Sequence, residues 1–388
     1  MYRILASTIQ EKSKYTKILL GARQTGKTTL LKNSFPDAVY INIEKSDYID
    51  IFNSRDINKI KEALAKESGK DSYQTLILDE VQRLDNPGLA AKIIYDEIKN
   101  ISLILSGSSS LEIASKISES LAGRKETYSL YPLTVGEYLA QTNKIKTLKP
   151  LVDIKSKNTS LSFFANLFFL MKYGLYPELL NIDTNDKKEK YLLELVDSAI
   201  LKDVYYFGLV KNTKKIASLL KLLAYQIGQQ INYSDLASRV GVARATVIDY
   251  IEILKQTYII YTLPPFTKKR RDEIGKMEKI YFYDLGIRNA LINDFSPVEY
   301  RVDYGNIFEN FAINELIKLN NYYNWRYKFY YWRTKAGSEV DLILQKDEKI
   351  SAIEIKTRKS AISKAFKDTY PDAKTINITL DNLLNFIL

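Results

Sequence analysis

The sequence contains no cysteine and no histidine among its 388 residues. Their absence excludes disulfides, thiolate nucleophiles, zinc sites built from Cys and His, and any catalysis that needs a histidine base. Metal chemistry in this protein must therefore use carboxylates, carbonyls, hydroxyls and water, the ligands of hard cations such as Mg²⁺ or Mn²⁺. A chain without cysteine also suits a reducing compartment.

Long apolar runs are also missing. The most apolar stretch, from Leu161 to Met171, has 11 residues and includes Ser162 and Asn166. A stretch of that length is too short to span a bilayer. The N-terminal segment lacks the order of charged, apolar and small residues that a signal peptide has. We therefore expect a soluble, cytoplasmic protein with no membrane partner.

The composition is that of a globular protein with two or three domains, since 46% of the 388 residues are hydrophobic and 27% are charged. The net charge is +11, and it is unevenly distributed. Residues 211–280 carry 13 Lys and Arg against 6 Asp and Glu, a difference of +7. A localised basic block of this kind is what a polyanion-binding surface needs, although a solvated lysine-rich face has the same composition.

A phosphate-binding loop follows the first apolar run, Lys17 to Leu20. The next residues read GARQTGKTT, in which Gly21, Gly26, Lys27 and Thr28 match G-x-x-x-x-G-K-[ST] between a predicted strand and a predicted helix. The glycines let backbone N–H groups close around a β-phosphate. We expect Lys27 to reach the β- and γ-oxygens and the Thr28 hydroxyl to ligate Mg²⁺. The predicted nucleotide-binding segment also includes Ala22, Arg23, Gln24, Thr25 and Thr29.

Two further predicted strands end in polar residues. The run Thr75 to Leu78 ends in Asp79 and Glu80, which suits a Walker B element. Asp79 would hold Mg²⁺ through water, and Glu80 would polarise the attacking water. The run Ile101 to Leu105 ends in Ser106, and the carboxyl ends of strands in a doubly wound sheet bind ligands, so Ser106 would face the γ-phosphate. The three strands together predict nucleotide hydrolysis.

Arg124 is a candidate for the cation that stabilises transition-state charge, in cis or from a neighbouring subunit. The alternative is an ordinary surface arginine beside Lys125, and Arg83 is a second candidate just after the acidic pair. Without an unambiguous trans-acting arginine, ring, dimer and monomer all stay open.

Residues 213–256 have the pattern of a helix-turn-helix. A first helix is predicted with its cap at Ser234, and Gly241 supplies the turn. A second helix is predicted from about Ala243 to Gln256. The residues expected to face outward for base or phosphate contacts are Arg244, Thr246 and Tyr250.

A wing is predicted after this helix. The run Tyr258 to Leu263 alternates as a strand, two prolines turn it, and the basic segment Lys268 to Arg271 follows. Such a basic tip suits phosphates or the minor groove, and together with the +7 charge it predicts DNA as a partner. The alternative is a winged helix that is structural or binds protein.

Three acids and a lysine near the C-terminus predict a carboxylate site. Glu309 lies in a predicted helix, Asp341 near the start of a strand, and Glu354 and Lys356 two apart on the next strand. Residues i and i+2 of a strand face the same side. Asp341 and Glu354 would chelate Mg²⁺ or Mn²⁺, Lys356 would orient water or stabilise charge, and Glu309 would complete the shell. Such residues also occur on solvated strand faces.

Together these segments resemble the bacterial and archaeal AAA-type P-loop ATPases whose C-terminal domain of unknown function has a PD-(D/E)xK restriction-endonuclease-like core, here without the proline before the aspartate. The matching segments, in order, are GARQTGKTT, LILDEVQRL, LSGSSS, LAGR, LYPLTVGEYL, YGLYPELL, LKDV, YFYDLGIRNAL, GNIFENFAINEL, YYWRTKAGSEVDLIL and IEIKT. The resemblance implies ATP as the nucleotide, and an α/β fold with a doubly wound parallel sheet, a winged helix and a nuclease-like end.

The domains expected on this basis are a P-loop ATPase domain at 1–145, a helical lid or connector at 146–210, a winged helix at 211–272 and a nuclease-like domain at 273–388. The function expected is ATP hydrolysis by a DNA-associated protein with a magnesium-dependent nuclease-like domain. The alternative is an ATPase switch whose C-terminal domain binds DNA or a protein partner without cleaving.

Overall fold

The computed structural model describes residues 2–69, 74–108, 120–142, 160–197, 213–267 and 277–388. The chain divides into two compact units. Unit 1 comprises Met1–Tyr131 together with Gln256–Tyr258, and unit 2 comprises Pro132–Lys255 and Ile259–Leu388. The N-terminal part of unit 1 ends at Tyr131, before the domain boundary expected at residue 145. The segments expected at 146–210, 211–272 and 273–388 lie in unit 2, apart from Gln256–Tyr258.

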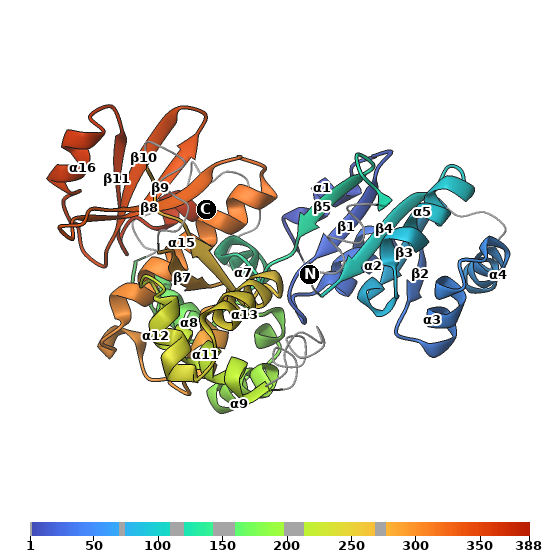
Figure 1. Ribbon diagram of the computed structural model, residues 1–388, viewed down its shortest axis with the longest axis horizontal. Helices are drawn as coiled ribbons and strands as arrows, with labels where there is room; N and C mark the ends of the chain where they lie inside the picture. The colour runs from blue at the N-terminus through green and yellow to red at the C-terminus, as the bar shows by residue number, and fades with distance from the viewer. Residues whose placement is uncertain (1, 70–73, 109–119, 143–159, 198–212, 268–276) are drawn as a thin grey trace. The chain divides into compact units, whose positions relative to one another are not determined.

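Unit 1 is built on a five-stranded sheet in the order β2-β3-β4-β1-β5, and each neighbouring pair is parallel (Figure 1). The prediction of an α/β fold with a parallel sheet is confirmed. The strands are β1 (Thr16–Leu20), β2 (Val39–Asn42), β3 (Thr75–Asp79), β4 (Ser102–Gly107) and β5 (Lys125–Ser129). Because the strands are parallel, the ends of β1, β3 and β4 meet at one edge of the sheet.

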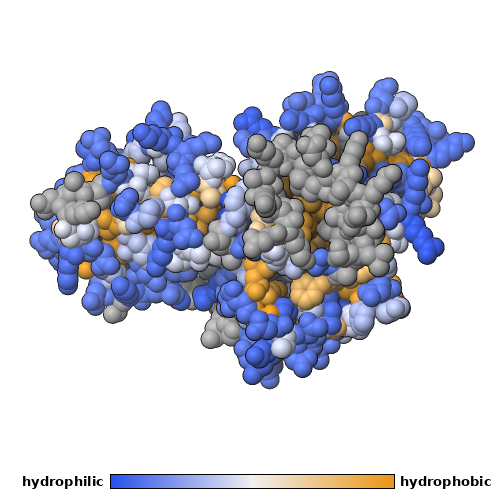
Figure 2. All heavy atoms as spheres, turned by 180° about the vertical axis from the view of Figure 1, so that it is seen from behind, coloured by the Kyte–Doolittle hydropathy of each residue, from blue (hydrophilic) through white to orange (hydrophobic). Residues whose placement is uncertain are grey.

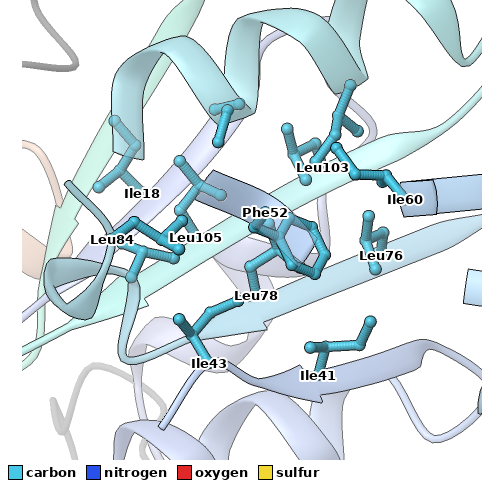
Figure 3. Close-up of a cluster of buried hydrophobic side chains, with 14 of the residues drawn as sticks. Ile18, Ile41, Ile43, Phe52, Ile60, Leu76, Leu78, Leu84, Leu103 and Leu105 are labelled. Carbon is cyan, nitrogen blue, oxygen red and sulfur yellow. The ribbon is translucent and has the colours of Figure 1, made fainter. Parts of the chain in front are cut away.

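The central strands are continuous apolar runs because both faces of the sheet are covered. All five residues of β1 are buried, and so are four of the five in β3. Figure 3 shows the core on one face, where Ile18, Leu78 and Leu105 from three strands pack with Phe52 and Ile60 from two helices. This core fixes the strand ends that carry the polar residues.

The helices of unit 1 begin at capping residues where the sequence supplies them. The Asp56 side chain accepts from the Asn58 N–H at the start of α4, and Asn86 accepts from the Leu89 N–H at the start of α5. The helical elements are α1 (Leu5–Gln10), α2 (Lys27–Ser34), α3 (Ser46–Asn53), α4 (Ile57–Ser68), η1 (Val81–Arg83) and α5 (Pro87–Glu97).

Unit 2 begins with helices. Its first helix has a capping box, in which Thr134 accepts from the Glu137 N–H and Glu137 accepts from the Thr134 N–H. The helical elements up to residue 256 are α7 (Val135–Gln141), α8 (Ser160–Tyr173), η2 (Pro177–Leu180), α9 (Asn185–Leu195), α11 (Thr213–Tyr225), α12 (Tyr233–Val240) and α13 (Arg244–Gln256). The later ones are α14 (Leu285–Leu291), η5 (Val298–Tyr300), α15 (Tyr304–Tyr322), α16 (Lys364–Thr369) and α17 (Leu384–Ile387).

Two sheets complete unit 2 (Figure 1). An antiparallel pair is formed by β6 (Ile260–Leu263) and β7 (Lys279–Phe282). A four-stranded sheet has the order β11-β10-β9-β8, in which β10 and β11 are parallel and the other neighbours antiparallel. Its strands are β8 (Lys328–Arg333), β9 (Glu339–Lys346), β10 (Lys349–Ile355) and β11 (Lys374–Ile378).

Helices α12 and α13 lie close to their predicted positions, with Gly241 in the left-handed conformation between them at φ 69°. Two details of the prediction are wrong. The cap of α12 is Asn232, whose side chain accepts from the N–H groups of Ser234 and Asp235, because Asx side chains reach two and three residues ahead. Tyr250 is buried rather than outward, since it lies one turn from Val247 on the packed face of α13.

The surface is mainly polar. Figure 2 shows hydrophilic side chains over most of the described residues in that view, with apolar side chains in smaller areas between them. Within the described ranges, the structure contains no helix that has both the length and the apolar character needed to cross a membrane.

Candidate functional site

The predicted phosphate loop joins β1 to α2 in unit 1. Gly26 is the N-cap of α2 with φ 93°, a left-handed conformation that glycine adopts without strain. Gly21 lies against the backbone of Leu130, the residue after β5, and a Cβ at this position would meet the Leu130 carbonyl oxygen at 2.2 Å. Both glycines are therefore required by the loop's shape. The predicted loop residues Ala22, Arg23, Gln24, Thr25 and Thr29 all lie in this turn or the first turn of α2.

Lys27 closes the loop. Its buried ammonium group donates to the carbonyl oxygens of Gly21 and Ala22, each at 2.9 Å, and the Thr25 hydroxyl also donates to Ala22 O. The ammonium group thus lies inside the turn whose N–H groups would surround a phosphate. The sequence places Lys27 in this role, and the structure positions its charge at the loop.

The Asp79 side chain, at the end of β3, accepts hydrogen bonds from residues of α2, β2 and β4. The Thr28 hydroxyl donates to Asp79 Oδ2 at 2.6 Å, Ser106 donates to Oδ1, and the Tyr40 hydroxyl also donates to Oδ2. Burial would raise the pKa of Asp79, but the hydrogen bonds from Ser106, Thr28 and Tyr40 and the charge of Lys27 outweigh it and lower the pKa. Asp79 is therefore a carboxylate, and with the Thr28 hydroxyl it offers the hard oxygen ligands that fit Mg²⁺.

Glu80 is held in an unusual backbone conformation, with φ 59° and ψ 39°. The Gln82 amide donates to Glu80 Oε2 and, at 3.2 Å, to the Ser108 hydroxyl. A non-glycine residue in this region costs of order 1–3 kcal/mol and persists where its surroundings impose it, often at functional sites. Gln82 therefore holds one oxygen of the Glu80 carboxylate, and Ser108 holds the Gln82 amide in place.

The two arginine candidates lie at different ends of the sheet. Arg124 precedes β5, and its carbonyl accepts from the Thr16 N–H at the start of β1, opposite the phosphate loop. It is half exposed and pairs with Asp96 at 3.1 Å. The structure does not bring Arg124 to the loop in its own chain, so its role in trans stays a prediction. Arg83, on η1, pairs with Glu44 at 2.6 Å.

Reasoning from sequence missed three residues of this site. Arg3 is buried and donates to Thr25 O at 2.9 Å and to Tyr131 O at 2.6 Å, which ties the phosphate loop to the end of unit 1. Tyr40 and Gln82 bond the two acids described above. None of the three belongs to a sequence motif. The only feature of the sequence that could have pointed to them is a polar residue inside an apolar stretch or beside an acid.

The carboxylate residues predicted near the C-terminus meet in unit 2. The antiparallel register that pairs Leu342 with Ile353 places Asp341 beside Glu354. Lys356 donates to Asp341 Oδ1 at 2.7 Å and Oδ2 at 2.8 Å, and lies 3.6 Å from Glu354 Oε1. Asp341 Oδ2 also accepts from the Ile355 N–H at 2.8 Å. Strand pairing thus assembles three of the four residues.

Glu309 lies on α15 and is buried with a lysine that the sequence analysis missed. Its Oε1 accepts from Lys279 at 3.2 Å and from the Tyr281 hydroxyl, and Lys279 also pairs with Glu339 at 2.5 Å. Burial raises the pKa of Glu309, which Lys279 opposes and the charge of Asp341 reinforces. The cluster therefore has two parts, each with a lysine between two acids. Lys356 lies between Asp341 and Glu354, and Lys279 lies between Glu309 and Glu339.

The fit of a divalent cation to this cluster depends on Glu354. Its Oε2 is buried and has no hydrogen-bond partner, and burial followed by the charge of Asp341 raises the pKa of Glu354 to about 7. No group of three or more acids that could hold a metal occurs in the described parts of the chain. Mg²⁺ is commonly held by one or two carboxylates plus substrate phosphates, and Asp341 and Glu354 are two such carboxylates side by side.

The three residues predicted to face outward from α13 differ in exposure. Arg244 is exposed, with its guanidinium 5.8 Å from the centre of the Tyr233 ring, and Thr246 is half-buried. Tyr250 is buried, as described above. The basic segment Lys268 to Arg271 lies outside the described residues.

Three family descriptions match separate parts of the chain: "AAA domain" matches residues 13–139, "Domain of unknown function (DUF8612)" residues 165–297, and "Domain of unknown function (DUF4143)" residues 304–382. The first match covers the parallel sheet and the phosphate loop. Residues 13–139 are therefore similar to an AAA domain, over the part of the chain that carries the phosphate loop.

Similar proteins span most of the chain. Two uncharacterized proteins of Methanocaldococcus jannaschii are 26% and 28% identical, over 94% and 92% of this chain and 80% and 79% of their own lengths. An uncharacterized protein of Mycobacterium tuberculosis is 24% identical over 94% of this chain and 75% of its own. Among solved structures, a Walker-type ATPase of Pyrococcus abyssi is 15% identical with a TM-score of 0.46, and the match covers 74% of this chain and 93% of that one.

Proposed function

We propose that unit 1 hydrolyses ATP. The observation that carries this proposal is the convergence on Asp79 of hydroxyls from Thr28 and Ser106, at the edge of the sheet where Lys27 closes the phosphate loop. Lys27 would contact the β- and γ-phosphate oxygens, and Mg²⁺ held by Thr28 and Asp79 would neutralise charge on those oxygens. Ser106 then keeps Asp79 oriented and faces the γ-phosphate.

Glu80 is the residue proposed to act on water. Its carboxylate would accept a proton from the water whose oxygen attacks the γ-phosphorus, while the bond from that phosphorus to the bridging oxygen breaks and ADP leaves. The Gln82 contact supports this role because it holds one Glu80 oxygen and leaves the other to water.

The test compares Lys27→Ala and Glu80→Gln with wild type in ATP turnover and ATP binding. Lys27→Ala should lose both, whereas Glu80→Gln should bind ATP normally and lose roughly 10²- to 10⁴-fold in kcat, the contribution usual for a positioned base. Lys59→Ala, which removes an exposed cation on α4 of the same unit, is the matched control. Wild-type turnover by Glu80→Gln would contradict the proposed role.

A second function is proposed for unit 2, in which the C-terminal cluster cleaves a phosphodiester bond of DNA. The unpartnered Glu354 Oε2 beside Asp341 favours it. When bound, Mg²⁺ or Mn²⁺ would polarise the scissile phosphate and its attacking water. Burial lowers the pKa of Lys356, but the nearby acids, above all Asp341, raise it by more. Lys356 would therefore place a positive charge next to that phosphate. Without cleavage, the same domain would serve as a DNA- or protein-binding part of an ATP-driven switch.

We also propose that α11 to α13 with the β6–β7 pair form a winged helix that contacts DNA through the exposed face of α13. The order of elements and the +7 charge of residues 211–280 support this. Incubation of wild type and Asp341→Ala with supercoiled and branched DNA, Mn²⁺ and ATP tests cleavage. Cleavage that Asp341→Ala abolishes supports the nuclease, and absence of cleavage in both favours the switch.

A further inference from the structure

Three exposed aromatic residues lie close together between α15 and β8. Tyr323, Trp325 and Tyr327 are 47%, 36% and 36% exposed, and every residue from Tyr323 to Lys328 is exposed. We call this segment, residues 323–328, the aromatic loop. Large aromatic side chains gain stability from burial, so three in one short loop that each leave a third to a half of their surface in water indicate a surface that something covers.

The aromatic loop has a defined shape because one side chain pins it. The Asn320 side chain accepts from the Tyr327 N–H at 2.9 Å and donates to the Tyr327 carbonyl at 3.1 Å, while the Asn320 carbonyl accepts from the Trp325 N–H at 3.0 Å. Asn324 and Arg326 both take positive φ, at 51° and 63°. The bonds to Asn320 fix these turns, and the turns keep the rings at the surface instead of in the core.

Two of the three rings form a stacked pair. Tyr323 and Trp325 are stacked, with centroids 5.7 Å apart and planes inclined by 18°. The Lys346 ammonium lies 5.4 Å from the centre of the Tyr327 ring. A stacked, pre-formed pair of rings loses little conformational entropy when a third flat ring stacks on it. A nucleobase is the flat ring that every nucleotide presents, whatever its sequence.

Cations lie beside these rings. Arg326 belongs to the loop, and the β9–β10 turn next to it brings Lys346 and Lys349, which face each other across the register. Lys328 pairs with Gln345 and so faces the other side of the sheet. The acids of this turn are Asp347 and Glu348, so three cations stand against two anions. Aromatic rings interleaved with net positive charge are what single-stranded nucleic acid needs, because its bases stack while its phosphates are neutralised.

We propose that the aromatic loop binds single-stranded DNA. The function proposed for unit 2 also concerns DNA, but binding at the aromatic loop requires neither ATP nor the carboxylate cluster. Asp341 and Lys346 lie five residues apart on β9, about 17 Å at 3.4 Å per residue. An odd separation places their side chains on opposite faces of the sheet, so the aromatic loop is a separate site from the Asp341 cluster.

The test is binding of a fluorescently labelled 20-nucleotide oligo(dT) to the full-length protein in EDTA without ATP. Trp325→Ala should weaken binding at least about fivefold, and Trp325→Phe should keep most of the affinity because it retains a stacking ring. Tyr300→Ala removes an aromatic side chain that is 84% exposed elsewhere in unit 2 and should bind as wild type.

Tryptophan emission gives a second readout. The chain has two tryptophans, Trp325 and the buried Trp332. Oligo(dT) should quench the wild-type emission, and the quenching should disappear in Trp325→Phe. The double variant Arg326→Ala with Lys349→Ala should lower the dependence of log Kd on log salt by roughly 1.4, from about 0.7 per phosphate contact on single strands.

Because the assay contains EDTA and no ATP, it needs neither a metal ion nor nucleotide hydrolysis, so failure of cleavage or of ATP hydrolysis leaves this proposal standing. The proposal is overturned if wild type does not bind oligo(dT), or if Trp325→Ala binds it within twofold of wild type. Tighter Trp325-dependent binding to oligo(rU) would also overturn it, because the ligand would then be RNA.

Discussion

The Tyr40 hydroxyl and the Thr28 hydroxyl donate to the same oxygen, Oδ2 of Asp79. Tyr40 comes from β2, the neighbour of β3, and its ring also lies 4.4 Å from the Lys32 ammonium. Burial and the hydrogen bond to Asp79 raise the pKa of Tyr40, so it remains a donor at neutral pH. Tyr40 is thus a positioning residue for the aspartate proposed to hold magnesium.

Replacement of Tyr40 by Phe should raise the Mg²⁺ concentration for half-maximal ATP turnover by roughly tenfold, the usual effect of removing a hydrogen bond to a metal ligand. ATP binding without Mg²⁺ should not change. Tyr48→Phe is the control, because it removes a phenol–carboxylate bond to Glu67 on the exposed surface of unit 1. An unchanged Mg²⁺ dependence in Tyr40→Phe would show that Tyr40 does not position Asp79.

Arg3 should matter for ATP affinity although it lies outside the loop motif. Arg3→Ala removes charged donors from the carbonyls of Thr25 and Tyr131, and such bonds contribute about 1.5–3 kcal/mol each. We expect a lower free energy of unfolding and a raised KM for ATP, with partial recovery in Arg3→Lys, which keeps the charge but not the two-pronged geometry.

Urea unfolding and ATPase kinetics measure both effects. Lys12→Ala, which removes an exposed cation of the same N-terminal segment, is the control. A KM in Arg3→Ala equal to that of wild type, together with lower stability, would restrict Arg3 to a structural role.

Gly21→Ala should destabilise unit 1 by about 1–3 kcal/mol, because its Cβ would meet the Leu130 carbonyl oxygen at 2.2 Å and backbone atoms must shift. The Leu130 N–H donates to Leu20 O at 2.7 Å, so the shift disturbs the loop and ATP binding together. Gly305→Ala, which meets nothing within 4 Å on helix α15, should instead be neutral or slightly stabilising. Equal urea midpoints for the two variants would refute this account.

Asp284 should make the stability of unit 2 depend on pH. Its Oδ2 accepts from the Leu175 N–H at 2.8 Å and its Oδ1 from the Ile287 N–H at 3.1 Å, yet burial raises its pKa to about 6 against the effect of these bonds and of Lys318. The folded state then holds a proton that the unfolded state releases at lower pH. Stability from this group is full below pH 3.8 and is lost as the pH rises through about 6.

The expected loss between pH 4 and 7 is about 3 kcal/mol, since each pKa unit corresponds to about 1.4 kcal/mol. Other buried acids add their own pH dependence, so the measurement is the difference between wild type and Asp284→Asn in urea unfolding at each pH. Asp183→Asn, which alters an exposed acid, is the control. Parallel curves for wild type and Asp284→Asn would contradict the prediction.

Much of unit 1 follows from sequence because its signals are local. A few neighbouring residues are enough to recognise the apolar run, the glycine-rich turn with Lys27 and the acids after the next run. Because parallel strands end at one edge of the sheet, these signals also predict that Thr28, Asp79 and Ser106 lie together. The four C-terminal residues were found in the same way, because Glu354 and Lys356 are two apart on a strand. Periodicity failed at Tyr250, where packing of α13 decided which face is buried.

Tertiary structure alone decided the partners of these residues. Arg3 and Tyr131 are 128 positions apart, Lys279 and Glu309 are 30 apart, and nothing local marks any of them as part of a site. The place of Arg124 at the far end of the sheet likewise depends on the strand order, because β5 comes late in the chain yet pairs with β1. Sequence therefore determined which chemical groups each strand end carries, and long-range packing, which no local pattern encodes, determined what neutralises, orients and buries them.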